Sequence, residues 1–553
     1  MSEVRYNGNN MIGLATTPEY RDVAGEFFEL FKTAWEFCRS GKEYDAIVCC
    51  GVNPPDACAN LVVIYSADEL NFDRQHQLHV RRQNSGDGAS YRGWFLPGYS
   101  GLASIENGHD PIQAKTRFSL AREVGVGGQF FVRVGYDLFS EVRHLLCNGQ
   151  PVQFANVPSI EIHITILRDL LVEYQVAFDE VPPVPVGYNF IACLTHDVDH
   201  FAIRNHKWDH TIFGFLYRAS LGSLVELFQG RKSPRQVARN WLAVLSLPLV
   251  YLEIVPDFWS KLDRYLELDP ASTFFIIPKK GEAGLAPTGE CHSRRAARYD
   301  VSQLQVSIGE ILARGGEVAA HGIDSWRDTS EAKKERDKIQ ALSHSSEVGV
   351  RMHWLFFDSE SARKLDEAGF VYDSTFGYNE TVGYRAGTTQ AFRPFGTKFL
   401  LELPLHIMDT ALFYPSHLHL SAERAMIRVD AMVDDVRHFG GALMVNWHDR
   451  SIAPERLWED FYVRLVRKLE AAGAWFCTAG QAAEWFQHRR KANFETIKTE
   501  MAMAQARGKH DLPGLRIRSY PSASSSRIRA SKGGGAASSN VLPKDAGKVA
   551  SVI

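Results

Sequence analysis

The chain has 553 residues, of which 45% are apolar and 23% charged, and its formal net charge is -3. This is ordinary globular composition, and the length exceeds the usual size of one hydrophobic core, so two domains are expected. The nearly balanced charge gives no reason to expect a nucleic-acid partner.

The first residues, Met1 to Asn7, are polar and lack the basic-then-apolar layout of a secretory signal, which predicts a cytoplasmic protein. The eight cysteines are irregularly spaced and include no Cys-x-x-Cys pair. Neither a disulfide framework nor a cysteine-based zinc site is therefore expected.

Residues 1–185 mix helix and strand signals, which predicts a mixed α/β domain of unknown role. The apolar runs at 59–65 and around Cys49 and Cys50 are typical of buried strands. The segment 181–187 contains three prolines, which favour an extended chain, so we expect a stiff linker and a domain boundary there.

From 186 to 490, short apolar strands alternate with helical segments, such as those at 359–368 and at 422–439. This pattern favours parallel βα units, and seven or eight of them indicate a distorted or incomplete (β/α) barrel. Polar side chains follow many of these strands, at the edge where such barrels assemble active sites. The expected strands lie near 190–195, 272–277, 316–320, 348–353, 370–373, 399–405, 441–446 and 474–477.

A helical insertion is expected at about 204–268, with apolar stretches at 212–228 and 241–255. Between residues 204 and 240 there are seven Lys or Arg and two acids. One interpretation is that the helices pack on the flank of the barrel. The other is a peripheral membrane contact through 204–255 that meets anionic or lipid-linked substrate, since each stretch is short for a span and Pro248 interrupts the second.

The last segment, 505–553, is rich in Ser, Gly, Ala and basic residues. Such a composition buries too little apolar surface to order itself. We expect a disordered basic tail there.

Asp197 and Asp199 stand two apart at the end of an apolar strand, so both carboxylates should point the same way. This places a potential metal ligand beside a potential general base. His321 ends another strand and precedes Gly322; an imidazole and a carboxylate are a normal ligand pair for a divalent ion such as zinc. Strand-end turns and surface histidines give the same pattern without chemistry.

Arg351 and His353 also stand two apart on one strand, and the permanent charge of Arg351 could keep a base such as Asp197 ionised. His448 could donate a proton to a leaving group, with Asp449 nearby to hold it charged. A structural ion pair and a surface histidine are the alternatives.

These residues resemble the NodB-type polysaccharide deacetylases of carbohydrate esterase family 4, over roughly 190–487. The run from Thr195 to Asp199 is similar to the family's Thr-Phe-Asp-Asp-Gly strand end, which supplies a catalytic-base Asp and then a metal-ligand Asp. His321 matches one histidine of its His-x-x-x-His motif, Arg351 the arginine that orients the base, and His448 the acid. The run from Leu365 to Arg393 also looks like the divergent branch near lipopolysaccharide and capsule biosynthesis genes.

Two positions depart from the family pattern. Val198 occupies the slot of the ligand Asp, so Asp199 must substitute from one residue later, and Ser325 stands where the second ligand histidine is expected. Asp324, His353 or His200 could complete the shell, and we favour His353 because it lies on the adjacent rim.

The resemblance implies a metal-dependent hydrolase, with zinc as the expected ion, that removes an N-acetyl or related acyl group from a sugar of a surface polysaccharide or lipopolysaccharide precursor. The expected partner is a glycan or lipid-linked sugar, contacted by Arg385, Trp447 and Asp409. Two alternatives stay open: a catalytically decayed glycan-binding barrel, or a glycosidase that pairs Asp197 with Asp373 or Asp409.

Overall fold

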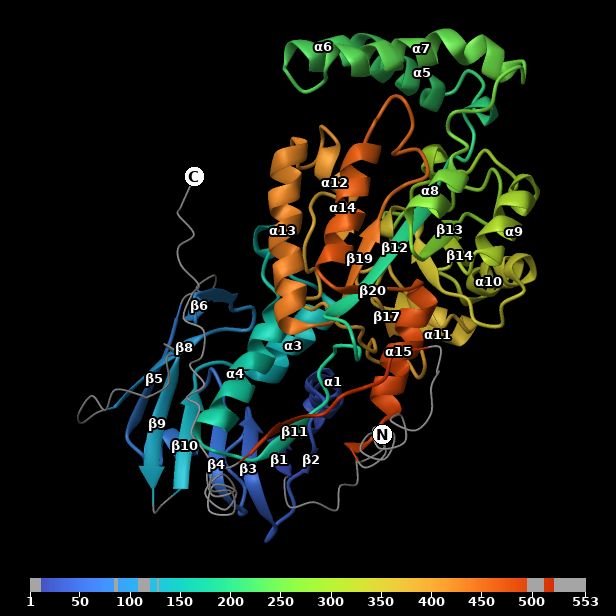
Figure 1. Cartoon of the computed structure of the whole chain (residues 1–553). Helices are drawn as coiled ribbons and strands as arrows, with labels where there is room; N and C mark the ends of the chain where they lie inside the picture. Colours follow the sequence, from blue (N-terminus) through green and yellow to red (C-terminus); the bar gives the residue numbers. More distant parts are fainter. Residues whose placement is uncertain (1–10, 84–87, 108–119, 127–128, 495–511, 522–553) are drawn as a thin grey trace, which may run out of the picture.

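The computed structural model describes residues 11–83, 88–107, 120–126, 129–494 and 512–521. Two large sheets organise the chain, and a layer of helices stands beyond the second sheet, at the top of the view in Figure 1. The first sheet lies at the opposite end of the molecule.

The first sheet has six strands in the order β2-β1-β3-β4-β10-β9. The central strands β3 (Glu43–Cys50) and β4 (Cys58–Tyr65) are the two predicted apolar runs, and both end in consecutive buried residues. Neighbouring strands are parallel except at the β10–β9 edge. The expected mixed α/β N-terminal region is confirmed. Its other main elements are β1 (Ile12–Thr16), α1 (Arg21–Phe31), β2 (Trp35–Phe37), β9 (Ala121–Val126), β10 (Gln129–Val134), α3 (Leu138–Cys147) and α4 (Ser159–Glu173).

The second sheet has nine strands, all paired in parallel. Neighbours along the chain are neighbours in space from β12 to β17, and β19 returns to pair with β12, as in a barrel. Among the described residues, however, β17 and β18 share no ladder, so the barrel is open along one seam. The predicted incomplete (β/α) barrel is thus confirmed. Its strands are β12 (Phe190–Val198), β13 (Ser272–Ile276), β14 (Glu317–Gly322), β15 (Val350–Met352), β16 (Tyr372–Asp373), β17 (Leu401–Glu402), β18 (Ile407–Met408), β19 (Ala442–Asn446) and β20 (Ala474–Phe476).

Helices cover the outside of this sheet (Figure 1). The one predicted at 422–439 is α13 (Ala422–Phe439), whose inward face carries Val429 and Val433 and which ends at Gly440 with φ 85°. The one predicted at 359–368 is α11 (Ser361–Ala368). The others are α8 (Leu262–Leu268), α9 (Gln305–Ala313), α10 (Thr329–Ser343), α12 (Asp409–Phe413), α14 (Glu459–Ala471) and α15 (Ala479–Lys491).

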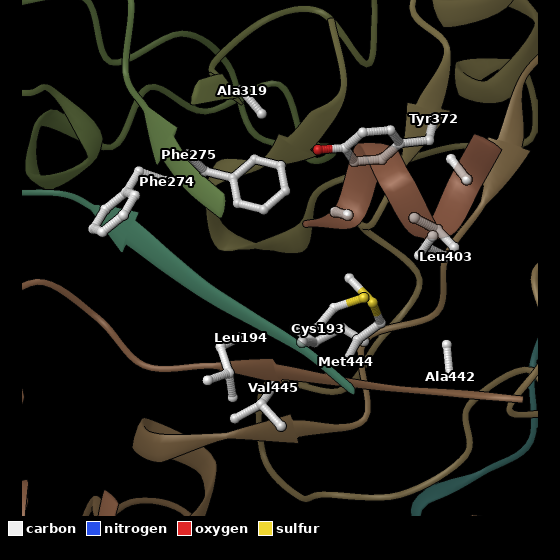
Figure 2. Close-up of a cluster of buried hydrophobic side chains, with 14 of the residues drawn as sticks. Cys193, Leu194, Phe274, Phe275, Ala319, Tyr372, Leu403, Ala442, Met444 and Val445 are labelled. Carbon is white, nitrogen blue, oxygen red and sulfur yellow. The ribbon is translucent and has the colours of Figure 1, made fainter. Parts of the chain in front are cut away.

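Every residue of β12 is buried, because this strand lies at the centre of the sheet and is covered on both faces. Figure 2 shows side chains from different strands of the sheet, such as Phe275 of β13 and Tyr372 of β16, turned toward one another in the core. Successive residues point to opposite sides: Phe275 lies under the guanidinium of Arg351, whereas Phe274 lies against His196 outside the barrel.

The proline-rich segment 181–187 is packed rather than free. The backbone oxygen of Val181 accepts a hydrogen bond from Arg489 Nε at 3.0 Å, and that of Pro183 accepts one from the Gly441 N–H at 2.7 Å. On the N-terminal side, the Val181 N–H donates to the backbone oxygen of Lys32 at 2.9 Å, so both sides of the expected boundary are tied to this segment.

The prediction of a disordered tail over 505–553 is wrong for residues 512–521. There β21 (Arg518–Tyr520) pairs antiparallel with β11 (Phe178–Glu180), and Tyr520 stacks on Phe178 with ring centroids 4.4 Å apart. A few apolar contacts order this short piece, which the average composition of the tail conceals. The rest of the predicted tail lies outside the described residues.

The insertion after β12 contains a rod made of α5 (His210–Tyr217), η4 (Arg218–Gly222) and α6 (Ser223–Phe228), followed by α7 (Pro234–Tyr251). Pro248 lies inside α7, which continues past it. Ile212 and Phe215 of the rod pack with Leu247 of α7 and with Trp259 in a separate small apolar cluster.

Candidate active site

Polar side chains from four strands meet at the C-terminal edge of the second sheet. Alternation along β12 places Thr195 and Asp197 on one face, and Asp199 follows the strand. The register opposes Thr195 to Asn446 of β19, and His321 of β14 to Arg351 of β15. Residues far apart in the sequence are therefore neighbours at one edge.

Asp199, His321 and His353 form a group whose ligand atoms all lie within 4.8 Å of one another. Asp199 Oδ1 is 3.3 Å from both His321 Nε2 and His353 Nδ1, and these two nitrogens are 2.9 Å apart. They are the three residues expected from the sequence as metal ligands. The other two candidates are engaged elsewhere: His200 Nδ1 lies 3.2 Å from His206 Nε2, and Asp324 accepts from Arg327 Nε at 3.0 Å.

The donor set fits a divalent cation. His321 Nδ1 faces the backbone oxygen of Arg351 at 3.0 Å, which assigns the ring proton to Nδ1 and leaves the Nε2 lone pair directed into the group. Asp199 Oδ1 is buried without a well-formed hydrogen bond in the described part of the chain. Burial lowers the pKa of His353, which favours the neutral imidazole that binds metals. Three protein ligands are typical of a catalytic zinc site rather than a structural one.

A strained turn presents His353. Trp354 and Leu355 follow it with φ values of 65° and 54°, in the left-handed region that non-glycine residues rarely adopt. Arg295 Nη2 donates to the backbone oxygen of His353 at 3.1 Å, and Asn379 Nδ2 donates to that of Trp354 at 3.1 Å. Such strain persists where the surroundings over-determine it, and it clusters at functional sites.

Asp197 lies beside this group, with Oδ2 3.8 Å from His321 Nε2. Arg351 Nη1 donates to its Oδ1 at 3.0 Å, and Asn446 Nδ2 donates to its Oδ2 at 2.7 Å. Burial opposes ionisation, but the electrostatic attraction of the neighbouring His321 and Arg351 side chains outweighs it and holds the pKa of Asp197 below its ordinary value. A buried carboxylate is thus kept charged and fixed in direction.

Arg351 is fully buried, and its guanidinium is held on several sides. Nη1 also donates to Thr195 Oγ1 at 2.7 Å, Nε to the backbone oxygen of Ser374 at 3.1 Å, and Nη2 to Ser374 Oγ at 2.9 Å. Its planar fork therefore has one allowed position, which in turn fixes Asp197.

His448 faces the same group from the loop that follows β19, with Nε2 3.9 Å from Asp199 Oδ2. Its other nitrogen, Nδ1, is 2.6 Å from Asp409 Oδ1. Burial alone would lower the pKa of His448, but the charge of Asp409 and its hydrogen bond raise it to about 10. A charged imidazolium at this place is a proton donor.

The sequence predicted Asp449 as the partner of His448, but the structure pairs His448 with Asp409. Asp449 Oδ2 instead accepts the N–H groups of His200 at 2.9 Å and Phe201 at 2.8 Å, so it shapes the turn after β12. Asp409, expected to contact substrate, is fully buried and holds His448.

Two further expected substrate contacts are placed elsewhere. Trp447 is fully buried and stacks on Phe461 with centroids 5.7 Å apart, because it alternates with Asn446 and His448 and so points away from the site. Arg385 donates to the backbone oxygen of Gly377 at 2.7 Å and lies over Phe357, in a packed region beside the N-terminal domain.

The two departures from the deacetylase pattern have structural explanations. Val198 is fully buried and points away from the site, so Asp199 on the facing side takes the ligand position. Ser325 donates to Glu335 Oε2 at 2.5 Å, in a buried contact apart from the metal group.

Three residues that hold the site had no role of their own predicted from the sequence: Thr195, Asn446 and Ser374. Thr195 and Asn446 stand two residues before Asp197 and His448 respectively, so strand alternation could have found both. Ser374 follows β16, and no local signal indicates that its hydroxyl meets Arg351.

No family model matches the chain, and no curated protein matches it. Among solved structures, a protein assigned as a polysaccharide deacetylase from Mycobacterium smegmatis is 19% identical over 56% of this chain and 96% of its own, with a TM-score of 0.34. Agd3, described as a novel carbohydrate deacetylase, is 8% identical over 87% of each chain, with a TM-score of 0.33.

A CE4 family pseudoenzyme from Bacillus anthracis is 14% identical over 41% of this chain and 62% of its own, with a TM-score of 0.24. At these identities and TM-scores the similarities carry no argument about activity. The chemistry of the site rests on its own residues: a three-ligand group flanked by a fixed carboxylate and a charged imidazole.

Proposed function

We propose that the protein is a metal-dependent hydrolase that removes an N-acetyl or related acyl group from a sugar of a surface polysaccharide or lipopolysaccharide precursor. The observation that carries the proposal is the convergence of Asp199, His321 and His353 between an Asp197–Arg351 pair and a His448–Asp409 pair. A ligand group, a base and an acid are the three parts that amide hydrolysis at such a site requires.

Asp199, His321 and His353 would hold a divalent ion, which supplies Lewis acidity toward the acyl oxygen and acidifies a nearby water. Asp197 accepts the proton of the attacking water. Arg351 and Asn446 keep that carboxylate ionised and aimed, since each oxygen accepts one of their hydrogen bonds. His448 then gives its Nε2 proton to the departing amine, because Nδ1 is committed to Asp409.

Trp354 supports a sugar substrate. It follows His353 directly, keeps 38% of its surface exposed, and lies against His292 with ring centroids 5.7 Å apart. An exposed aromatic face beside the ligand group offers a flat apolar surface for a sugar ring.

The test is metal analysis combined with an acetate-release screen on acetylated nucleotide sugars and lipid-linked glycans. We expect bound divalent metal and released acetate; Asp197→Asn should keep the metal and lose at least about 100-fold in turnover. Asp434→Asn, an exposed carboxylate on α13, is the matched control and should be fully active. Glycan binding without metal or turnover would instead favour a non-catalytic barrel.

A glycosidase has less support. Asp409 is committed to His448 and Ser451, and Asp373 accepts a hydrogen bond from Thr375, so neither faces Asp197 as a free second carboxyl. A cut glycosidic bond without acetate release would reverse this assignment.

A further inference from the structure

We propose that the outer face of the helical insertion binds the surface of an anionic lipid bilayer and holds the catalytic edge of the barrel beside it. Twelve of the 22 exposed large apolar side chains in the described residues lie between residues 208 and 254. We call these twelve the insertion face. They are Trp208, Phe213, Tyr217, Leu221, Val225, Phe228, Trp241, Leu242, Leu245, Leu249, Leu252 and Ile254.

The spacing gathers these residues into stripes. Phe213, Tyr217, Leu221 and Val225 are four apart along the first rod, and those of α7 recur every three or four residues. The opposite sides of both helices are apolar as well, and they pack together in the small cluster around Trp259. A helix that only covered a soluble barrel would be polar on its outer side.

Exposed basic residues border the insertion face and match an anionic surface. Lys207, Arg231, Arg235 and Arg239 are exposed. The three acids between residues 204 and 254 are compensated locally: Glu226 pairs with Lys232 at 2.8 Å, Glu253 lies 3.8 Å from Arg204, and Asp209 caps α5. The remaining positive charge favours anionic headgroups over neutral ones.

The arrangement suits a helix pair lying on the membrane rather than crossing it. By length and composition the rod His210–Phe228 could span a bilayer, with 28% of its apolar window buried. Spanning would pull Ile212 and Phe215 away from Trp259 and break the cluster they form. An interfacial position uses only the exposed stripes and leaves that cluster intact.

The insertion face and the catalytic edge lie at the same end of the molecule. Lys232 Nζ donates to the backbone oxygen of Glu455 at 3.2 Å, and Trp259 Nε1 donates to Glu455 Oε2 at 3.2 Å. Glu455 belongs to the loop that starts at His448, and Figure 1 shows α5, α6 and α7 as a layer beyond α12 and α14. Docking would therefore bring a lipid-linked sugar to the site, a consequence that rests on the proposed function.

The test is cosedimentation of the full chain with vesicles of phosphatidylcholine alone or mixed with phosphatidylglycerol. We expect binding to the mixed vesicles. The pair Phe228→Ser and Leu245→Ser should weaken it by about 100-fold, roughly tenfold for each side chain. The matched control, Phe399→Ser with Val306→Ser, removes equally exposed apolar side chains from other elements and should bind normally. Arg235→Gln with Arg239→Gln should weaken binding to the anionic vesicles by about 30-fold at low salt.

Failure of the wild type to bind either vesicle overturns the proposal, as does equal loss in the control. A dimer in light scattering that Phe228→Ser dissociates, without vesicle binding, assigns the face to a second copy. Retention of the protein in the membrane pellet after alkaline carbonate extraction would show that the rod His210–Phe228 crosses the bilayer instead of lying on it. Acetate release from a soluble sugar is measured on the same variants: activity without vesicle binding refutes only this inference, and vesicle binding without activity refutes only the proposed hydrolase.

Discussion

Replacing Glu161 by glutamine is expected to remove a pH-dependent part of the protein's stability. Glu161 lies in the first turn of α4, where its Oε1 accepts hydrogen bonds from Thr388 Oγ1 at 2.5 Å and the Thr389 N–H at 3.1 Å across the domain contact. Its Oε2 is buried and has no hydrogen-bond partner among the described residues. Burial raises the pKa of Glu161 from 4.5 to about 7, although the threonine hydrogen bonds oppose the change.

The sign follows from the direction of this change. The folded protein keeps the Glu161 proton at pH values where the unfolded chain has lost it. Protonation therefore contributes stability that is complete below about pH 4.5 and lost as the pH rises through about 7. The whole difference corresponds to about 3 kcal/mol, most of which falls between pH 5 and pH 8.

The measurement is urea unfolding of the wild type and Glu161→Gln at pH 5 and pH 8, followed by tryptophan fluorescence. The free energy of unfolding of the variant, relative to the wild type, should rise by about 2 to 3 kcal/mol between the two pH values. Glu173→Gln, exposed on the same helix, is the control and should show no such change. A relative change below about 1 kcal/mol would refute the reasoning.

Four further predictions concern the site. Asp199→Asn should lose the bound divalent ion in elemental analysis and still unfold cooperatively; retained metal would exclude Asp199 as a ligand. Val198→Asp should cost about 3 kcal/mol or more of stability in denaturant unfolding, because it buries a charge outside the site. Tighter metal binding by this variant would instead contradict the assignment of Asp199 as the ligand in place of residue 198. Arg351→Lys should lower kcat by about 100-fold at unchanged metal content, since an ammonium cannot replace the fork; full activity would remove Arg351 from the mechanism. Chelator treatment should abolish acetate release, and added zinc should restore it. Activity in metal-free protein would exclude a metal-dependent mechanism.

The sequence predicted most of the strands of the barrel and several of the side chains that meet at its C-terminal edge, because both depend on local patterns. Period-two alternation placed Asp197 and Asp199 on one side, and the ends of strands selected His321, Arg351 and His448. The same alternation, applied to residues 446–448, would have predicted that Trp447 points away from the site.

What the sequence could not predict depends on contacts between distant segments. His353 was predicted as a ligand, but the turn that presents it was not, because no glycine or asparagine signals the two left-handed residues that follow it. Arg385 was misplaced because it lies in the long segment between β16 and β17. The path of that segment is set by the N-terminal domain.

The same segment, between β16 and β17, also spans the open seam of the barrel between β17 and β18. On one side of the gap, Phe392 exchanges backbone hydrogen bonds with Glu402 of β17. On the other side, the backbone oxygen of Thr388 accepts from His406 Nε2, just before β18, at 3.0 Å. The backbone oxygen of Thr389 accepts from the Ala442 N–H at 2.7 Å. Its other side receives the N-terminal domain: the Tyr384 N–H donates to the backbone oxygen of Ala155 at 2.7 Å. One stretch of chain thus bridges the gap in the barrel and seats the neighbouring domain. The two domains are therefore not independent modules. A barrel excised at residue 185 would keep the stretch that bridges its seam but lose the N-terminal domain that packs against that stretch.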